Sequence, residues 1–331
     1  MSAQDPRRPG VAVLGELFNA RRPIERALRY LRRVIFPPPL RPGDTIAVIA
    51  PSGPFDRDAA LRGIAWLEQR YRVSYRESMF ARDGYLAGSD ERRLGELQRA
   101  LDSDAKAVVA ARGGYGLARI VHLVDWTRVK RKPRWMVGFS DFTALHAEAW
   151  RRGLASIHGS MICALANAME ETRRQWIAIL ERPADERTWT GLERWRRGRA
   201  EGVLVGGNLA TLHACAAASR LRIPKGAVIL IEDIGERSYR VDRMLTNLLT
   251  GGHLANAVAV IVGSFTECDA GAEGKKVEDV LRERLSSLDV PVVAGFPAGH
   301  GRRNDALVLG ASMEVDAARG ICRVGSPAGG A

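Results

Sequence analysis

Short apolar runs alternate with amphipathic segments along most of the chain. From residue 42, the run "DTIAVIAP" is short and β-branched, and the following "DRDAALRGIAWLEQRY" repeats its apolar positions at helical spacing. The alternation continues through "RVSYRES", "SDERRLGELQRAL", "AKAVVAAR", "LARIVHLVDW", "RWMVGFS" and "DFTALHAEAWRRG", where Ser89 is the predicted cap of the second helix. Near-continuous apolar strands between helices predict a parallel sheet covered by helices.

A second alternating region follows residue 200. It runs through "GVLVGGNLATLHACAAAS", "GAVILIED", "YRVDRMLTNLLTGG", "AVAVIVGSF", "KKVEDVLRERLSSL" and "PVVAGFP". The tail "ALVLGASMEVDAARGICRV" alternates like an antiparallel pair that turns at residues 317–320. The predicted fold class is therefore α/β, with an N-terminal parallel-sheet domain over 42–165 and a C-terminal α/β domain with a β-rich tail over 201–331. Residues 166–200 are predicted to be an irregular linker.

The first 41 residues form a basic extension. They hold nine arginines and three acidic residues, which is half of the net charge of +12. In "RRPIERALRYLRRVIFPPP" the residues Ile24, Leu28, Leu31 and Ile35 share one helical face, and the prolines at 37–39 are expected to end the helix. We expect this helix to pack on the domain or on a partner subunit. Contact with an anionic membrane surface is the alternative.

Composition excludes several classes of protein. The remaining charge is spread over 290 residues without interleaved aromatics, so no nucleic-acid partner is expected. The four cysteines lie far apart and no HExxH spacing occurs, so we expect neither a disulfide scaffold nor a metal site built on a recognisable motif. No charge-free run approaches the roughly 18 residues of a membrane span, and the N-terminal "VAVLGELF" lacks the features of a signal peptide. These features predict a cytoplasmic protein.

Ligands of open α/β sheets bind beyond the carboxyl ends of the strands, which directs attention to the polar residues there. In "GFSD", Ser140 lies on a predicted strand-to-helix turn, where a nucleophile would be exposed and the N–H of Asp141 would face an oxyanion. Ser140 could equally cap the helix, and the carboxylate of Asp141 could do the same. Because GxSxG is absent, this stretch alone leaves both interpretations open.

Three other strand ends carry candidate chemistry, each with an ordinary structural alternative. "LIEDIGE" supplies Glu232, which could orient a histidine or cap a helix, and "AGHGRR" supplies His300, which could be an unremarkable loop residue. His158 in "IHGSM" is the other histidine at a strand end. The glycines of "ARGGYG" could donate N–H groups to a ligand or form a tight turn, and the absence of GxGxxG gives nucleotide binding little support.

In this order, the motifs resemble the LD-carboxypeptidase family of serine peptidases, which includes the cytoplasmic muramoyltetrapeptide carboxypeptidases and the related microcin immunity peptidases. The matching segments cover residues 41 to 312 and are "RPGDTIAVIAPSGP", "RGGYGLARIVHLVDW", "GFSDFTALH", "HGSM", "EGVLVGGNLATL", "LIEDIGERSYRVDRMLTNL", "GSF" and "PAGHGRRNDALVLGA". Two departures stand out. Ser160 of "HGSM" replaces a usual proline, and typical members lack the basic extension.

The resemblance implies a Ser–His–Glu triad made of Ser140, His300 and Glu232. It implies oxyanion donors from the backbone of Asp141 and Gly114, no metal or cofactor, and commonly a homodimer. We add as candidate substrate-binding residues Arg112, Gly113 and Asn208. Arginines that could meet substrate carboxylates, or simply solvate the surface, are Arg112, Arg119, Arg302 and Arg303.

The implied activity is hydrolysis of a murein tetrapeptide, with release of its terminal D-alanine in peptidoglycan recycling. One alternative is an immunity-like amidase that acts on a peptidyl- or aminoacyl-nucleotide toxin. That site would need an aromatic wall for the base, and the sequence does not show whether Trp135 or another tryptophan reaches it. A second alternative is a non-catalytic muropeptide-binding protein.

Overall fold

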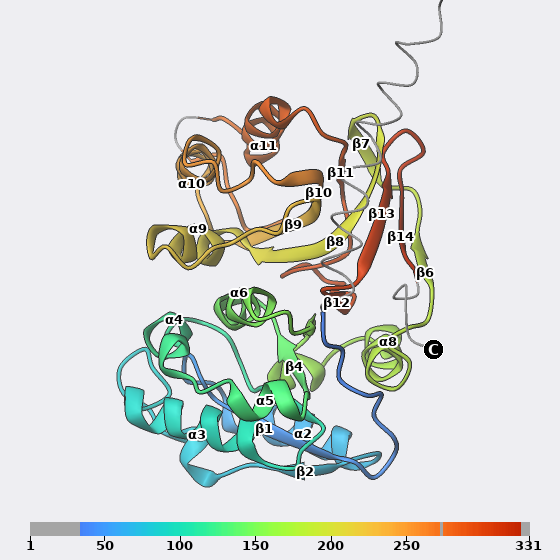
Figure 1. The fold of residues 1–331 in the computed structure, drawn as a ribbon. Coiled ribbons are helices and arrows are strands. Elements are labelled where there is room, and N and C mark those ends of the chain that lie inside the picture. Colours follow the sequence, from blue (N-terminus) through green and yellow to red (C-terminus); the bar gives the residue numbers. More distant parts are fainter. Residues whose placement is uncertain (1–33, 272–273, 326–331) are drawn as a thin grey trace, which may run out of the picture.

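The computed structural model describes residues 34–271 and 274–325, which fold into two α/β domains (Figure 1). The N-terminal domain is built on a six-stranded sheet of order β12-β5-β4-β3-β1-β2. The C-terminal domain is built on an eight-stranded sheet of order β6-β14-β13-β8-β9-β10-β11-β7. The α/β class predicted from the hydrophobic pattern is therefore confirmed.

The N-terminal sheet follows the predicted alternation. Its parallel strands are β1 (Thr45–Ile49), β2 (Arg72–Ser74), β3 (Ala107–Ala110), β4 (Trp135–Gly138) and β5 (Ser156–His158). Its helices are α2 (Arg57–Glu68), α3 (Asp90–Asp102), α4 (Leu117–Ile120), α5 (Thr127–Arg131), α6 (Thr143–Arg151) and α7 (Ile162–Leu165). Every residue of β3 and β4 is buried, because helices cover both faces. Ser89 caps α3 as predicted, accepting a hydrogen bond from the N–H of Arg92.

The C-terminal sheet combines a parallel centre with antiparallel edges. The parallel strands are β8 (Arg199–Asn208), β9 (Ala227–Ile234), β10 (Ala257–Thr266) and β11 (Val292–Ala294). The antiparallel strands are β6 (Arg187–Trp189), β7 (Glu193–Arg196), β13 (Ser312–Asp316) and β14 (Ile321–Val324), and the helices are α9 (Leu209–Ala217), α10 (Ser238–Thr250) and α11 (Val277–Leu285). Strands β13 and β14 form the predicted hairpin, with its turn at residues 317–320.

The prediction of an irregular linker over residues 166–200 is wrong. This segment contains α8 (Glu170–Glu181), β6 and β7, and both strands join the C-terminal sheet. Helix α8 packs on the N-terminal domain, where Trp176 meets Trp66 edge-on at 6.0 Å between ring centroids. The segment looked irregular because its strands are short edge strands that expose charged residues.

The tail does not belong to the C-terminal domain alone. Strand β12 (Leu307–Leu309) crosses to the N-terminal sheet and pairs antiparallel with β5. All three residues of β12 are buried, which fits the unbroken apolar run "ALVL". The predicted boundary at residue 201 therefore misses one strand, because strand pairing between distant segments leaves no local mark in the sequence.

The end of the basic extension is part of the N-terminal domain. Ile35 pairs with Leu154 in an isolated parallel bridge, so the helix predicted through Ile35 does not reach this residue. Leu40 is 2% exposed, and the indole N–H of Trp135 donates to the carbonyl of Pro38. The rest of that predicted helix, with Ile24, Leu28 and Leu31, lies outside the described residues.

The boundary between the domains is packed with apolar side chains around α6. This helix lies against α9 and β8, as Figure 1 shows near the centre of the molecule. One continuous buried cluster includes Leu145 of α6, Leu209 of α9 and Val205 of β8. Among the helices of the described chain, none is both long enough and apolar enough to cross a membrane.

Candidate active site

Ser140 occupies a sharp turn between β4 and α6. It opens the 3-10 turn Ser140–Phe142 with φ = 62°, in the left-handed region that non-glycine residues rarely adopt. Gly138 is needed beside it, because a Cβ at this position would lie 2.5 Å from Cγ of Phe142. In this described segment no side chain caps either the 3-10 turn or α6. Ser140 is therefore not a helix cap, and its strained backbone is compatible with the turn that carries the nucleophile in other hydrolases.

Asp141 ties this turn to the neighbouring glycine-rich loop. Its Oδ2 accepts a hydrogen bond of 2.9 Å from the N–H of Leu117, the first residue of α4. The carboxylate thus caps α4, whereas the sequence suggested that it caps its own helix. Burial raises the pKa of Asp141, whose side chain lies beneath the turn with a residue exposure of 5%.

Gly113 of "ARGGYG" lies directly against Ser140. A Cβ on Gly113 would lie 3.1 Å from Oγ of Ser140 and 3.0 Å from its Cβ. Gly114 has φ = 104°, and the carbonyl of Gly113 accepts a 3.0 Å hydrogen bond from the N–H of Gly53. Only glycine lets the backbone approach the serine this closely. The structure therefore brings Gly113 to the serine, with Gly114 next to it in the same loop.

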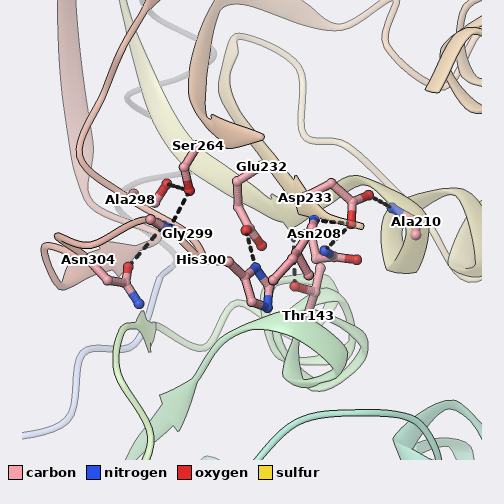
Figure 2. Close-up of polar contacts among 12 residues, drawn as sticks. Thr143, Asn208, Ala210, Glu232, Asp233, Ser264, Ala298, Gly299, His300 and Asn304 are labelled. Atoms are coloured by element: carbon pink, nitrogen blue, oxygen red, sulfur yellow. Dashed lines mark hydrogen bonds and ion pairs between the residues drawn. The ribbon is translucent and has the colours of Figure 1, made fainter. Parts of the chain in front are cut away.

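His300 and Glu232 meet on the C-terminal domain. Glu232 lies near the end of β9 and is fully buried, and its Oε2 is 2.7 Å from Nδ1 of His300 (Figure 2). A carboxylate that accepts a hydrogen bond from Nδ1 selects the neutral imidazole tautomer in which Nε2 is the acceptor. Gly299 makes the approach possible, because a Cβ there would lie 2.5 Å from Oε2 of Glu232.

The two halves of the site face each other across the domain boundary. The ring of Phe139, the residue before Ser140, packs on the imidazole of His300 with 4.7 Å between ring centroids. Nearby, the N–H of Asn208 donates to Oγ1 of Thr143 on α6 at 3.0 Å, which links the two domains (Figure 2). Within the described residues no hydrogen bond joins Ser140 to His300. Catalytic hydrogen bonds are often long before substrate binds, so a serine and a histidine that face each other without a hydrogen bond can still act as a pair.

Two other histidines near the turn are unsuited to proton transfer near neutral pH. Burial lowers the pKa of His146 to about 4, and its Nε2 and Nδ1 contact the carbonyl of Gly138 and the hydroxyl of Ser156. Burial lowers the pKa of His158 to about 3, and no group in the described structure hydrogen-bonds to its ring. His158, the rival of His300 in the sequence, is fully buried, whereas the side chain of His300 is 15% exposed.

The candidate substrate-binding residues differ in how many hydrogen bonds their side chains already make within the protein. The side chain of Asn208 donates to Asp233 and accepts from the N–H of Thr211, so it caps α9 and braces β9. Burial raises the pKa of Asp233 to about 6. Arg112 is exposed beside the glycine-rich loop and donates to the carbonyl of Pro54 at 2.6 Å.

Two of the four candidate arginines already hold carboxylates. Arg119 pairs with Asp90 at 2.9 Å, and Arg303 binds both oxygens of Asp305. Arg302 is exposed and forms no ion pair within the described part of the chain. Trp135, considered above as a wall for a nucleotide base, is fully buried in β4.

Among the described residues, no three histidine, cysteine, aspartate or glutamate side chains are grouped so that they could hold a metal ion. The sequence analysis missed three residues that shape the site, namely Phe139, Ser264 and Asn304. Ser264 and Asn304 contact the backbone on either side of His300 (Figure 2). Both residues lie in segments that resemble the family, "GSF" and "GHGRRN", but a serine and an asparagine in such segments carry no signal of this role.

Both domains of the chain match the models of one peptidase family. Residues 46–159 match the N-terminal domain of LD-carboxypeptidases, and residues 201–315 match their C-terminal domain. The chain is 32% identical over 289 residues to the murein tetrapeptide carboxypeptidase of Pseudomonas aeruginosa, an alignment that covers 83% of this chain and 94% of that protein. The chain therefore belongs to the LD-carboxypeptidase family of peptidases.

Solved structures agree with this placement. The muramoyltetrapeptide carboxypeptidase of Oxalobacter formigenes superposes with a TM-score of 0.77 at 29% identity, covering 85% of this chain and 99% of that one. The microcin C7 self-immunity protein in complex with aspartyl sulfamoyl adenosine superposes with a TM-score of 0.81 at 22% identity, covering 88% and 98%. At that identity the second similarity shows the fold alone.

Proposed function

We propose that this protein is a serine carboxypeptidase that hydrolyses the L,D peptide bond of murein tetrapeptides and releases the terminal D-alanine. The observation that carries the proposal is the 2.7 Å contact between His300 and Glu232. The ring of Phe139, the residue before the strained Ser140, packs on His300 and so keeps this pair beside the turn. The substrate is suggested by the relatives named as murein and muramoyl tetrapeptide carboxypeptidases. Peptidoglycan recycling is the process in which such a product would arise.

In the proposed reaction, His300 is the general base and Ser140 is the nucleophile. Nε2 of His300 takes the proton of the Ser140 hydroxyl as Oγ attacks the peptide carbonyl, and the carbonyl oxygen becomes an oxyanion. When the C–N bond breaks, His300 gives that proton to the leaving amine of D-alanine. A water molecule then attacks the acyl-enzyme by the same route and frees Ser140.

Glu232 serves the proposed reaction through His300. Its buried carboxylate accepts a hydrogen bond from Nδ1–H of His300, so Nε2 is available to Ser140, and its negative charge stabilises the imidazolium that forms. The oxyanion would be held by the N–H groups of Asp141 and Gly114. A backbone donor of this kind is typically worth about 10²–10³ in kcat.

Arginine side chains would hold the carboxylates of the substrate. Arg112 and Arg302 are the two candidates with no carboxylate partner within the described residues, and Arg112 directly precedes Gly113, which lies against Ser140. A guanidinium can bind a carboxylate through two parallel hydrogen bonds, which would select a peptide with a free C-terminus.

The proposal also includes a cytoplasmic location and a homodimer, as the family resemblance implies. Light scattering of the purified chain would give a mass near twice 36.2 kDa for the dimer. A mass of one chain at micromolar concentration would contradict that part of the proposal.

Release of D-alanine from murein tetrapeptide, measured with wild type and with Ser140→Ala, tests the function. We expect steady release by wild type and a loss of at least about 10⁴-fold in kcat for the variant, because the nucleophile is absent. A peptidyl-adenylate is assayed in parallel. Cleavage of the adenylate and not of the tetrapeptide would replace the proposed substrate, and near-wild-type activity of Ser140→Ala would overturn the assignment of the nucleophile.

A further inference from the structure

His300 lies on an irregular loop, and its position depends on what holds that loop. The histidine loop, residues 297–305, lies between β11 and β12 and contains no helix or strand. A 2.7 Å hydrogen bond from the N–H of Asp305 to the carbonyl of Pro297 closes it. Ordering an irregular backbone costs about 1–2 kcal/mol per residue, so specific contacts must offset this cost where the geometry matters.

Two side chains hold the amides directly before and after His300. The N–H of Gly299 donates to Oδ1 of Asn304 at 3.0 Å, and the N–H of Gly301 donates to Oγ of Ser264 at 2.9 Å (Figure 2). The hydroxyl of Ser264 in turn donates to the carbonyl of Ala298 at 3.2 Å. The residue that carries the imidazole is thus bracketed by two side-chain acceptors.

The position of Ser264 is set by an irregularity in its strand. Strand β10 pairs with β9, and the register shifts between Val262 and Phe265, where Gly263 and Ser264 lie. Such an irregularity redirects a side chain that a regular strand would place elsewhere. Strand β9 also carries Glu232, so Ser264 and Glu232 are both fixed to the same pair of strands.

The histidine loop, Ser264 and Glu232 are packed with little spare space. A Cβ on Gly299 would lie 2.5 Å from Oε2 of Glu232 and 2.7 Å from Oγ of Ser264. The backbone before His300 therefore runs in direct contact with both side chains. A shift of this backbone by a fraction of an ångström would lengthen the 2.7 Å contact between Nδ1 of His300 and Glu232.

We propose that Ser264 and Asn304 are positioning residues for His300, which hold its backbone so that Nδ1 stays bonded to Glu232 and Nε2 stays directed at Ser140. This inference rests on the proposed function, in which His300 is the general base. Neither residue touches the reacting atoms, so both act through His300. A misplacement of a catalytic group by about 1 Å can cost about 10²-fold in rate.

Matched variants separate the hydrogen bond from the space that each side chain fills. Ser264→Ala removes the hydroxyl, and Ser264→Thr keeps it. Asn304→Leu removes the acceptor oxygen and keeps the branched shape, with a larger volume, and Asn304→Asp keeps the acceptor oxygen. Asp is a suitable partner because the amide nitrogen of Asn304 has no hydrogen-bond partner within the described residues.

The first measurement is the kinetics of D-alanine release from tetrapeptide as a function of pH. We expect Ser264→Ala and Asn304→Leu to lower kcat about 10²-fold with KM within about twofold, because substrate contacts are unchanged and the base is displaced. Both variants should also shift the acidic limb of the kcat/KM profile, whereas Ser264→Thr and Asn304→Asp should recover at least a tenth of wild-type kcat. A purely structural role would lower the melting temperature and leave the pH profile of the folded enzyme in place.

The second measurement does not depend on the substrate. The proton shared by Nδ1 of His300 and Glu232 should give a low-field proton resonance in NMR spectra, assigned by its absence in His300→Gln. Ser264→Ala and Asn304→Leu should shift or broaden this resonance. Ser264→Thr, which keeps the hydroxyl, and Asn304→Asp, which keeps the acceptor oxygen, should retain it. If Ser264→Ala does not fold, Ser264→Cys provides the weaker hydrogen-bonding replacement.

These outcomes separate the positioning role of Ser264 and Asn304 from the proposed tetrapeptide hydrolysis. A protein that does not cleave tetrapeptide, but whose low-field resonance changes in Ser264→Ala and Asn304→Leu, has these positioning residues and a different substrate. Wild-type kcat and an unchanged resonance in both variants would overturn the proposal while the triad stands.

Discussion

Ser140 is held by the geometry of its backbone, whereas His300 is held by hydrogen bonds from side chains. On the N-terminal side, a positive φ at Ser140 and glycines at 113 and 138 shape the turn, and no side chain caps it within the described residues. On the C-terminal side, Glu232, Ser264 and Asn304 bond to the histidine loop. The turn itself spans residues 138–142, although Gly113 of a distant loop packs on it, whereas the contacts of the histidine loop join residues up to 68 positions apart.

The difference predicts where each half is vulnerable. The turn at residues 138–142 depends on a positive φ at Ser140 and on glycines at 113 and 138, so it responds to changes in backbone freedom and in the space beside it. A histidine oriented by distant side chains responds to the loss of single polar atoms. Substitutions on the two sides should therefore fail in different ways, the first mainly through sterics and strain and the second through proton chemistry.

The largest effect is expected from Glu232→Gln. The amide can donate to Nδ1 of His300, which favours the tautomer with its proton on Nε2, and kcat should fall about 10⁴-fold with little change in KM. D-alanine release measures this loss, and Glu236→Gln in the next loop is the matched control at wild-type rate. A Glu232→Gln enzyme within tenfold of wild type would remove Glu232 from the triad.

Acid should destabilise the N-terminal half through its buried histidines. The folded-state pKa is about 4 for His146 and about 3 for His158, below the ordinary value of 6.5, so the unfolded chain binds more protons between pH 6.5 and 4. The free energy of unfolding should therefore fall with decreasing pH in that window, by about 1.4 kcal/mol per pH unit for each histidine. Above pH 6.5 both histidines are neutral in the folded and the unfolded chain, so they no longer change the free energy of unfolding.

Urea unfolding at several pH values measures this slope. His158→Phe should reduce the slope by about one proton, because the ring of His158 has no hydrogen-bond partner to lose within the described structure. Equal slopes for wild type and His158→Phe would show that His158 is not a neutral buried group.

Gly113→Ala should affect the nucleophile without removing any polar group. The new Cβ would lie 3.0 Å from Cβ and 3.1 Å from Oγ of Ser140, so the serine must shift, and kcat should fall about 10²-fold. Gly95→Ala, where the new methyl meets only the flexible end of Arg99, is the control. Unchanged kcat in Gly113→Ala would mean that the loop moves to accommodate the methyl group and that Ser140 stays in place.

The smallest effect concerns the strain at Ser140 itself. Ser140→Ala and Ser140→Gly both remove the hydroxyl, but only glycine adopts φ = 62° without strain, so Ser140→Gly should be more stable than Ser140→Ala by about 1 kcal/mol. Thermal and urea unfolding of the two inactive proteins measure the difference. A less stable glycine variant would mean that the turn is not strained in the folded protein.

Much of the fold was readable because its strands are uniformly apolar. Strands β3 and β4 are buried at every position and appear in the sequence as "AVVA" and "WMVG". The cap of α3 at Ser89 and the hairpin of β13 and β14 were also predicted correctly, since both depend on neighbouring residues. The strands of residues 187–196 were missed, because exposed edge strands carry charges like those of a loop.

The candidate site was only partly readable from its residues. The serine, glutamate and histidine could be placed at strand ends, but local patterns did not distinguish a capping serine from a nucleophile. The resemblance to a family favours the nucleophile, and the structure adds a positive φ at Ser140 and no capping hydrogen bond from its side chain. Ser264 and Asn304 escaped notice, since a side chain that bonds to a distant backbone amide has no pattern of its own.

By itself, the sequence determined most of the order of helices and strands outside residues 166–200, the two-domain α/β class and the local turn at residues 138–142. Hydrophobic periodicity and backbone preference act over a few residues, so they can be read directly. Only the tertiary structure decided that β12 joins the N-terminal sheet, that Asp141 caps α4, and that the histidine loop is held by Ser264 and Asn304. Each of these depends on hydrogen bonds between segments far apart in the chain, which form only when packing brings their donors and acceptors together.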